Sequence, residues 1–159
     1  MILANWGNFP KVDAEVSTFV SDEQARALLV RPAPWVLRGL GRSYGDSSLG
    51  HYVLSTPEYN QILSFDPASG ELICEAGISL EQILANFVPQ GWFLPTTPGT
   101  KFVTLGGALA ADVHGKNHHR SGSFSEHVNW IDLLLASGEI LRCSATENTG
   151  LFLATCGGM

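Results

Sequence analysis

The residues best able to do chemistry gather in two segments that are rich in glycine and in cations. Five of the nine lysines and arginines lie in residues 38–50 and 99–123, and each segment holds a single acidic residue, although the whole chain has a formal net charge of -6. Unobstructed backbone N–H groups can converge on phosphate oxygens, and guanidinium groups add bidentate charge. The pattern predicts a bound anion, and ordinary basic loops are the alternative.

The first segment contains the run Arg38-Gly39-Leu40-Gly41-Arg42-Ser43-Tyr44-Gly45-Asp46. It lacks the G-x-x-x-x-G-K-[ST] string of a P-loop, and Tyr44 stands where the third glycine of a G-x-G-x-x-G dinucleotide fingerprint belongs. The run therefore predicts an anion-binding loop of another kind, with a glycine-rich surface turn as the alternative.

The second segment has little side-chain bulk, because Gly106 and Gly107 precede three alanines between residues 108 and 111. Such a backbone lets a flat group or a pyrophosphate come close. A helix that begins near Thr104 would also turn its N-terminal N–H groups toward an anion. Close packing of that helix on a sheet is the alternative.

Other chemistries find little support in the sequence. His114 and His118 have a ligand spacing for a helix, but Gly115 and Asn117 disfavour a helix there, so no metal site is expected. No pair of acids suggests glycoside hydrolysis, and no G-x-S-x-G string marks a serine hydrolase. The three cysteines are widely spaced and are predicted to be free, buried thiols.

The elements that must position these segments are those of an α+β protein. Ser79 and Gln82 form a capping-box pattern ahead of a helix, and turn residues join two pairs of strands into hairpins. The arm over residues 127–136 is apolar enough to be buried on both faces, and the four tryptophans are predicted to lie in the core. The expected strands are residues 35–38, 52–54, 62–66, 71–76, 92–94, 127–136 and 139–145, and the expected helices begin near residues 21, 79, 104 and 151.

Composition narrows the class of protein. With 45% hydrophobic and 15% charged residues, the chain is not disordered, and 159 residues are enough for one domain with its own core. No apolar run reaches the roughly 18 residues of a membrane span, and the acidic balance disfavours nucleic acid as a partner. The N-terminus lacks a signal-peptide pattern, so a cytoplasmic location is expected.

Four strings, taken together, resemble a known family. They are the run over residues 38–46, Pro98-Gly99-Thr100, Thr104-Leu105-Gly106-Gly107 and Asp112-Val113-His114-Gly115-Lys116-Asn117-His118-His119. The chain is similar to the FAD-linked oxidases of the vanillyl-alcohol-oxidase superfamily, which share a PCMH-type FAD-binding domain. Within it, the decaprenylphosphoryl-β-D-ribose 2′-oxidase group is the nearest in motif. The resemblance covers roughly residues 30–159.

The resemblance implies a fold and a domain organisation. Residues 1–159 would be the FAD-binding domain, with a small α/β subdomain over about residues 1–55 and the start of a second subdomain, a larger mixed sheet flanked by helices, over about residues 56–159. The family's C-terminal substrate or cap domain has no counterpart here. The chain is therefore expected to be truncated at its C-terminus and inactive by itself.

The resemblance also implies site residues. In this family the first loop wraps the FAD pyrophosphate and the second segment flanks the flavin. His114 and Lys116 would border the substrate pocket and serve as catalytic residues, and Arg42 stands where many relatives carry a histidine bonded to the flavin, so a non-covalent FAD is implied. The implied cofactor-binding residues are Arg38, Gly39, Leu40, Gly41, Arg42, Ser43, Tyr44, Gly45, Asp46, Gly99, Thr100, Thr104, Leu105, Gly106, Gly107, Ala111, Asp112, Val113 and His114.

The implied reaction is hydride transfer from a CH–OH group of a sugar or polyol to flavin N5. The protein would orient the cofactor and supply a base for the hydroxyl proton. An aldonolactone oxidase of the same superfamily is one alternative. A non-catalytic fragment that binds a nucleotide or a partner chain, such as a second copy of itself, is another.

Overall fold

The computed structural model describes all residues from 1 to 159, and its N-terminal part is built around a parallel sheet. Strands β3 (Glu15–Thr18) and β4 (Trp35–Arg38) both pair in parallel with β5 (Tyr52–Ser55), which lies between them. Helix α1 (Asp22–Leu29) connects β3 to β4, and Ser21 caps it by accepting a hydrogen bond from the Gln24 N–H. The central strand is the most buried because it has a neighbour on each edge.

A short antiparallel hairpin precedes this sheet. It pairs β1 (Ile2–Ala4) with β2 (Lys11–Asp13). The sheet itself packs on a small core of Phe19, Ala25 and Leu54. The C-terminal end of β4 leads directly into the first glycine-rich segment, so the sheet sets where that loop begins.

The second half of the chain starts with a hairpin and a capped helix. Strands β6 (Ile62–Asp66) and β7 (Glu71–Cys74) pair across the turn that the sequence predicts. The capping box at Ser79 is formed in both directions and starts α2 (Leu80–Phe87), which ends in the short 3-10 turn η1 (Val88–Gln90). Both sequence predictions are confirmed.

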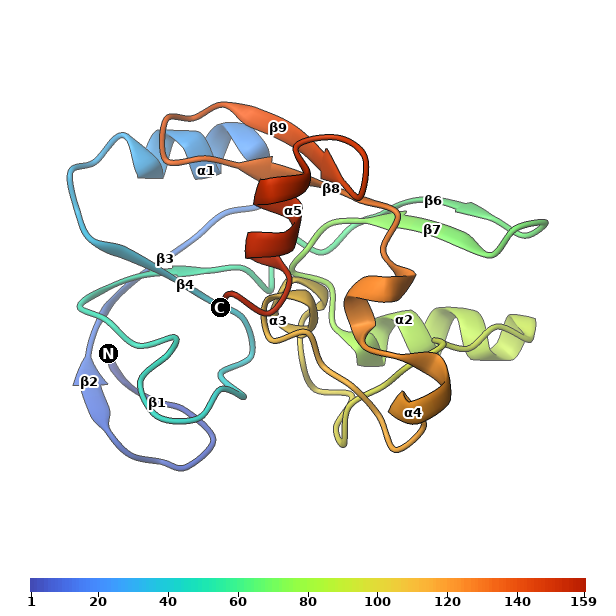
Figure 1. Ribbon diagram of the computed structural model, residues 1–159. Coiled ribbons are helices and arrows are strands. Elements are labelled where there is room, and N and C mark those ends of the chain that lie inside the picture. Colours follow the sequence, from blue (N-terminus) through green and yellow to red (C-terminus); the bar gives the residue numbers. More distant parts are fainter.

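Helix α3 (Leu105–Ala110) lies in the middle of the molecule, with the parallel sheet on one side and α2 with its hairpin on the other (Figure 1). It buries Ala108 and Leu109 in the larger core, alongside the apolar face of α2 and Phe124. Two short elements follow, α4 (His118–Ser121) and η2 (Phe124–His127). The larger core thus fixes α3 between the two halves of the fold.

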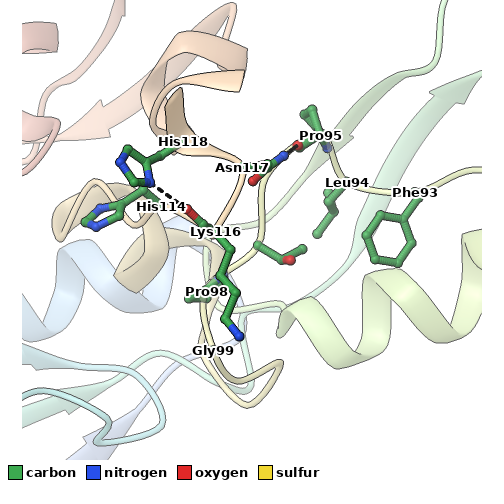
Figure 2. Close-up of a pocket in the computed structure, with 11 residues that line it drawn as sticks. Phe93, Leu94, Pro95, Pro98, Gly99, His114, Lys116, Asn117 and His118 are labelled. Atoms are coloured by element: carbon green, nitrogen blue, oxygen red, sulfur yellow. Dashed lines mark hydrogen bonds between the residues drawn. The ribbon is translucent and has the colours of Figure 1, made fainter. Parts of the chain in front are cut away.

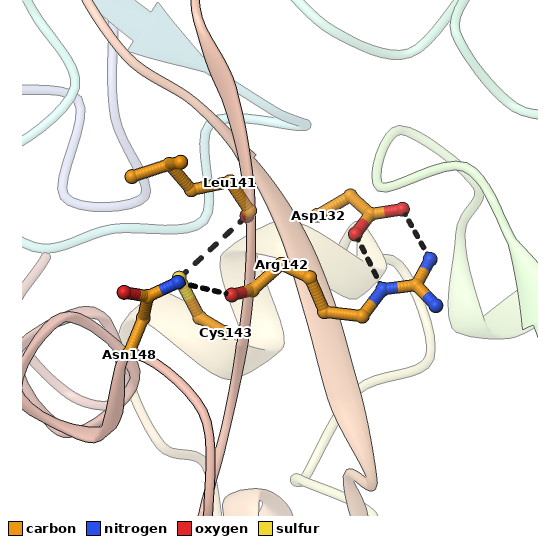
Figure 3. A network of polar contacts seen from close by, with 5 residues as sticks. All are labelled: Asp132, Leu141, Arg142, Cys143 and Asn148. Carbon is orange, nitrogen blue, oxygen red and sulfur yellow. Dashed lines mark hydrogen bonds and ion pairs between the residues drawn. The ribbon is translucent and has the colours of Figure 1, made fainter.

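The chain closes with the hairpin of β8 (Trp130–Leu134) and β9 (Ile140–Ser144) and with helix α5 (Thr149–Thr155). Figure 3 shows the polar contacts here: the Arg142 guanidinium makes two 2.8 Å hydrogen bonds to the Asp132 carboxylate, and the Asn148 side chain donates to the Arg142 carbonyl. Because Asp132 is exposed in mid-strand, the prediction that this arm is buried on both faces is wrong.

The α+β class is confirmed, but three expectations about its parts need correction. The larger mixed sheet is absent from the described residues, because β6–β7 and β8–β9 form separate two-stranded sheets; the Asn129 side chain, just before β8, donates a hydrogen bond to Glu71 of β7. Residues 92–94 form no strand, since Trp92 turns inward onto Gly70 and the core whereas Phe93 is exposed. Trp6 is exposed and does not belong to the core.

None of the helices has the length and the apolar character needed to cross a lipid bilayer.

Candidate functional site

The two glycine-rich segments meet where the first loop (residues 39–48) leaves β4. A Cβ atom on Gly39 would overlap the Thr104 hydroxyl and would lie 3.1 Å from its Cγ2. Thr104 is 3% exposed and is the N-cap of α3, where its Oγ1 accepts a hydrogen bond from the Gly107 N–H at 3.2 Å. The contact is close because residue 39 has no side chain, so the first loop lies against the N-terminus of α3.

The first loop keeps its backbone N–H groups free. None of the N–H groups from Gly39 to Ser47 donates to an acceptor within the protein. The carbonyls of the loop are used instead: Ser43 accepts from the Trp6 N–H at 3.2 Å and Gly45 accepts from the Asn5 side chain at 3.0 Å. A run of unpaired N–H groups is the arrangement that binds phosphate oxygens.

The five cationic side chains of the two glycine-rich segments differ in the partners that they contact. The Arg38 guanidinium turns inward and donates to Asn5, to Ser48 and to the Ala4 carbonyl, so it is not free for a ligand. Burial, and then the neighbouring charge of Arg42, lower the pKa of Arg38. Lys101 forms an ion pair with Glu81 at 3.0 Å. Arg42 is exposed and has no acidic partner, and its guanidinium lies 5.8 Å from the centre of the Trp6 ring.

Lys116 and Arg120, the remaining two cations, also lack an acidic partner. Lys116 lines a pocket of about 730 Å³ between residues 93–99 and 114–118. Figure 2 shows its side chain reaching from one wall toward the turn at Pro98 and Gly99 on the other. His114 and Gly99 line the same pocket, whereas the first loop and Thr104 do not.

One hydrogen bond joins the two walls of this pocket, and another holds residues within one wall. The Asn117 side chain donates to the Pro95 carbonyl across the pocket at 3.0 Å (Figure 2). His118 Nδ1 lies 3.1 Å from the Gly115 carbonyl oxygen, whereas no hydrogen bond joins the His114 ring to the protein. The rings of His114 and His118 stand 5.5 Å apart, edge to face. His114 is thus a free imidazole on a braced wall.

Some of the predicted residues of the second segment pack against the rest of the protein, and others are exposed. Gly106 packs on the loop before α2, because its N–H donates to the Ala76 carbonyl and a Cβ there would lie 3.2 Å from Ala76. The Leu105 N–H likewise donates to the Ile78 carbonyl. Gly107 of α3 and Ala111, the C-cap residue of that helix, are instead exposed, which gives a surface without side-chain bulk.

Asp112 faces a neighbouring turn. Its φ is +40°, and its carboxylate accepts a 2.9 Å hydrogen bond from the Ser125 N–H. Burial by itself would raise the pKa of Asp112, but the hydrogen bonds from Ser125 and Ser123 and the nearby His114 together hold it below its usual value. The carboxylate therefore braces the end of α3 against η2.

Three polar residues near the site could not be predicted from the sequence. Asn5 and Ser48 are buried polar side chains that hold the first loop, and Thr96 is 1% exposed with a hydroxyl that has no partner in the protein. No motif or spacing marks Asn5 and Ser48, because both owe their roles to contacts between distant parts of the chain. The sequence signal for Asn5 is limited to a polar residue at the end of an apolar strand.

Comparison with known proteins decides the family. A family model described as an FAD binding domain matches residues 11–144. The chain belongs to this FAD binding domain family. The match includes both glycine-rich segments and the pocket residues, and FAD is the cofactor.

The chain is also similar to individual oxidases and dehydrogenases. The chain is 40% identical over 152 residues to a decaprenylphosphoryl-beta-D-ribose oxidase of Mycolicibacterium smegmatis, covering 94% of this chain and 32% of the relative. It is 31% identical to the mitochondrial D-2-hydroxyglutarate dehydrogenase of Rattus norvegicus over 89% of this chain and 27% of the relative. A D-lactate dehydrogenase of Anaerostipes hadrus is 29% identical over 61% of this chain and 20% of the relative. The chain thus spans about a third or less of these relatives' length.

The residues of the site have the chemistry that FAD requires. The unpaired N–H groups of the first loop suit a diphosphate, and Arg42 adds a guanidinium without an acidic partner beside them. The exposed surface at Gly107 and Ala111 leaves room for a flat ring to approach the backbone. As an FAD binding domain, the chain brings these features together through the contact of Gly39 with Thr104.

Proposed function

We propose that the chain holds non-covalent FAD in an oxidoreductase that oxidises a CH–OH group of a sugar or polyol. The observation that carries this proposal is the pocket of about 730 Å³, in which His114 and Lys116 stand opposite a turn that leads through residues 99–104 to the N-terminus of α3. When bound, FAD supplies the hydride acceptor.

The residues of the chain do the remaining work. The N–H groups of the first loop and Arg42 bind the diphosphate. His114 accepts the proton of the substrate hydroxyl at a ring nitrogen, for which its lack of a protein partner leaves it free. Lys116 orients the substrate by donating hydrogen bonds to its oxygen atoms from the same wall as His114.

A second candidate is the oxidation of a 2-hydroxy acid. It is favoured by the similarity to a D-2-hydroxyglutarate dehydrogenase and a D-lactate dehydrogenase. The Lys116 ammonium, which has no acidic partner, would bind the substrate carboxylate in that case.

The test has two stages and uses the full product of the gene. FAD is added, excess is removed, and the retained flavin is measured by absorbance before and after denaturation; flavin that is retained and then released supports non-covalent binding. The flavin is next mixed without oxygen with a polyol, a sugar, an aldonolactone or a 2-hydroxy acid. Bleaching by the polyol or the sugar supports the sugar or polyol proposal, and bleaching by the aldonolactone alone favours an aldonolactone oxidase instead. Bleaching by the hydroxy acid alone replaces the proposal with the second candidate.

Variants test the two pocket residues. His114→Gln and Lys116→Met should keep FAD binding, and His114→Gln should slow flavin reduction by about 100-fold or more, the scale of a lost general base. Lys11→Met, which removes an exposed lysine on β2, is the control and should change neither quantity. Unchanged reduction in His114→Gln would remove His114 from the proton transfer.

A further inference from the structure

The N-terminal hairpin makes contacts that the family match does not include. The matched region begins at residue 11, whereas β1 and the two residues after it come earlier in the chain. Asn5, one of these two, is 6% exposed, although it follows a short strand at the edge of the molecule. A polar amide is rarely this buried unless its hydrogen bonds are satisfied.

The side chain of Asn5 makes hydrogen bonds to residues at both ends of the first loop and within it. Its Nδ2 donates to the Gly45 carbonyl at 3.0 Å, and its Oδ1 accepts from Arg38 Nη1 at 2.5 Å and from the Ser48 hydroxyl at 2.9 Å. The next N–H in the chain, that of Trp6, donates to the Ser43 carbonyl. The two ends and the middle of the loop are thus held by one buried side chain and its neighbour.

These contacts leave the binding groups of the loop untouched. Every one of them uses a loop carbonyl, a serine side chain or the Arg38 guanidinium, and none uses a loop N–H. Gly41 has a φ of +66°, and any side chain there would collide with the Arg38 guanidinium, so the loop closes tightly around the same anchor. The loop is fixed from behind while its N–H groups stay available.

We propose that Asn5 is a positioning residue for the diphosphate of FAD: it holds residues 39–48 in the shape whose N–H groups bind that diphosphate. The inference rests on the proposed non-covalent FAD binding. Its physical reason is preorganisation, because a loop that must be ordered during binding loses affinity, whereas one already held by supporting hydrogen bonds does not.

The experiment compares Asn5→Asp with the control Asn60→Asp. Asn5→Asp keeps an acceptor for Arg38 and Ser48 but removes the donor to Gly45, and Asn60→Asp removes a similar side-chain donor to a backbone carbonyl, that of Pro57. Affinities for FAD and for riboflavin, which has no diphosphate, are measured by fluorescence titration. Asn5→Asp should lose about tenfold or more in FAD affinity, the scale seen when supporting hydrogen bonds around a binding site are removed, and should keep its riboflavin affinity. Asn60→Asp should change neither.

The other possible results of these titrations overturn the inference. Equal losses for FAD and riboflavin would make Asn5 a general structural residue, and unchanged FAD affinity would remove it from the site. If the unaltered protein binds no FAD, the proposed function falls together with the inference; if it binds FAD and Asn5→Asp binds FAD with the same affinity, only the positioning role falls. Asn5→Asp also adds a negative charge near the loop, so the neutral Ser48→Ala, which removes one hydroxyl from the same network, is measured beside it and should show a smaller loss confined to FAD. No loss in Ser48→Ala would assign the effect of Asn5→Asp to that charge and overturn the inference.

Discussion

Gly39→Ala tests whether the cofactor site depends on the contact between the two glycine-rich segments. The added methyl would overlap the Thr104 hydroxyl and lie 3.1 Å from Thr104 Cγ2 and 3.3 Å from its Cβ. Thr104 cannot move aside easily, because its side chain is β-branched and caps α3 through the Gly107 N–H. Overpacking of this kind costs about 1–3 kcal/mol. If the first loop shifts away from α3 to relieve it, FAD affinity falls by about 5- to 150-fold.

The double variant separates this contact from other effects. Thr104→Ala alone loses a helix cap, which costs about 1 kcal/mol of stability. In Gly39→Ala/Thr104→Ala the overlap with the hydroxyl is gone, so FAD affinity should return to that of Thr104→Ala. Gly150→Ala, where an added methyl meets nothing within 4 Å, is the control. The reasoning is refuted if Gly39→Ala binds FAD normally by fluorescence titration, or if the losses of the two single variants simply add.

Other predictions concern single residues of the site. Arg42→Glu should weaken FAD binding by more than about 1.5 kcal/mol in the same titration, since it removes a guanidinium without an acidic partner; an unchanged Kd would exclude Arg42. Lys101→Met should leave the Kd as it is, because Lys101 is paired with Glu81. Gly107→Val should reduce FAD binding by adding bulk to the exposed face of α3, and normal binding would show that this glycine serves packing alone. The lowered pKa of Asp112 stabilises the fold above the ordinary carboxyl pKa of about 3.9, and that stability is lost as pH falls through the lower folded-state value. Asp112→Asn should therefore show a smaller loss of stability below about pH 4 in urea unfolding, and an identical pH profile would contradict this assignment.

Local patterns were sufficient for much of the fold. The capping box at Ser79, the turn between β6 and β7 and the helix that starts at Thr104 each depend on residues within a few positions of one another. Sequence therefore contains the information that selects them. The FAD binding domain could also be named from the two glycine-rich runs, because their residues stand in a fixed order and spacing.

The hydrogen-bond and ion-pair partners of the charged side chains depend on long-range contacts and could not be predicted from the sequence. Arg38 carries the charge expected of an anion ligand, yet its guanidinium is used by Asn5, Ala4 and Ser48, two of which lie more than thirty residues away. Lys101 was expected among the free cations for the same reason and is instead paired with Glu81. Side-chain type shows what a residue can bind, whereas the partner it meets is decided by the tertiary fold.

The apolar run at residues 92–94 shows a similar limit. Its composition suits a buried strand, but Trp92 packs against the turn at Gly70, whereas Phe93 is exposed and pairs with no strand. The same segment instead forms one wall of the pocket that holds His114 and Lys116. A short hydrophobic run does not distinguish these outcomes.

The most direct measurement of the central claim is a titration of the ¹⁵N-labelled protein with FAD, followed through its backbone amide resonances. We expect the amide resonances of Gly39–Ser47 and of the α3 N-terminus near Thr104 and Gly107 to shift together, with a single Kd. Shifts confined to one of these two segments, or located away from both, would contradict this claim.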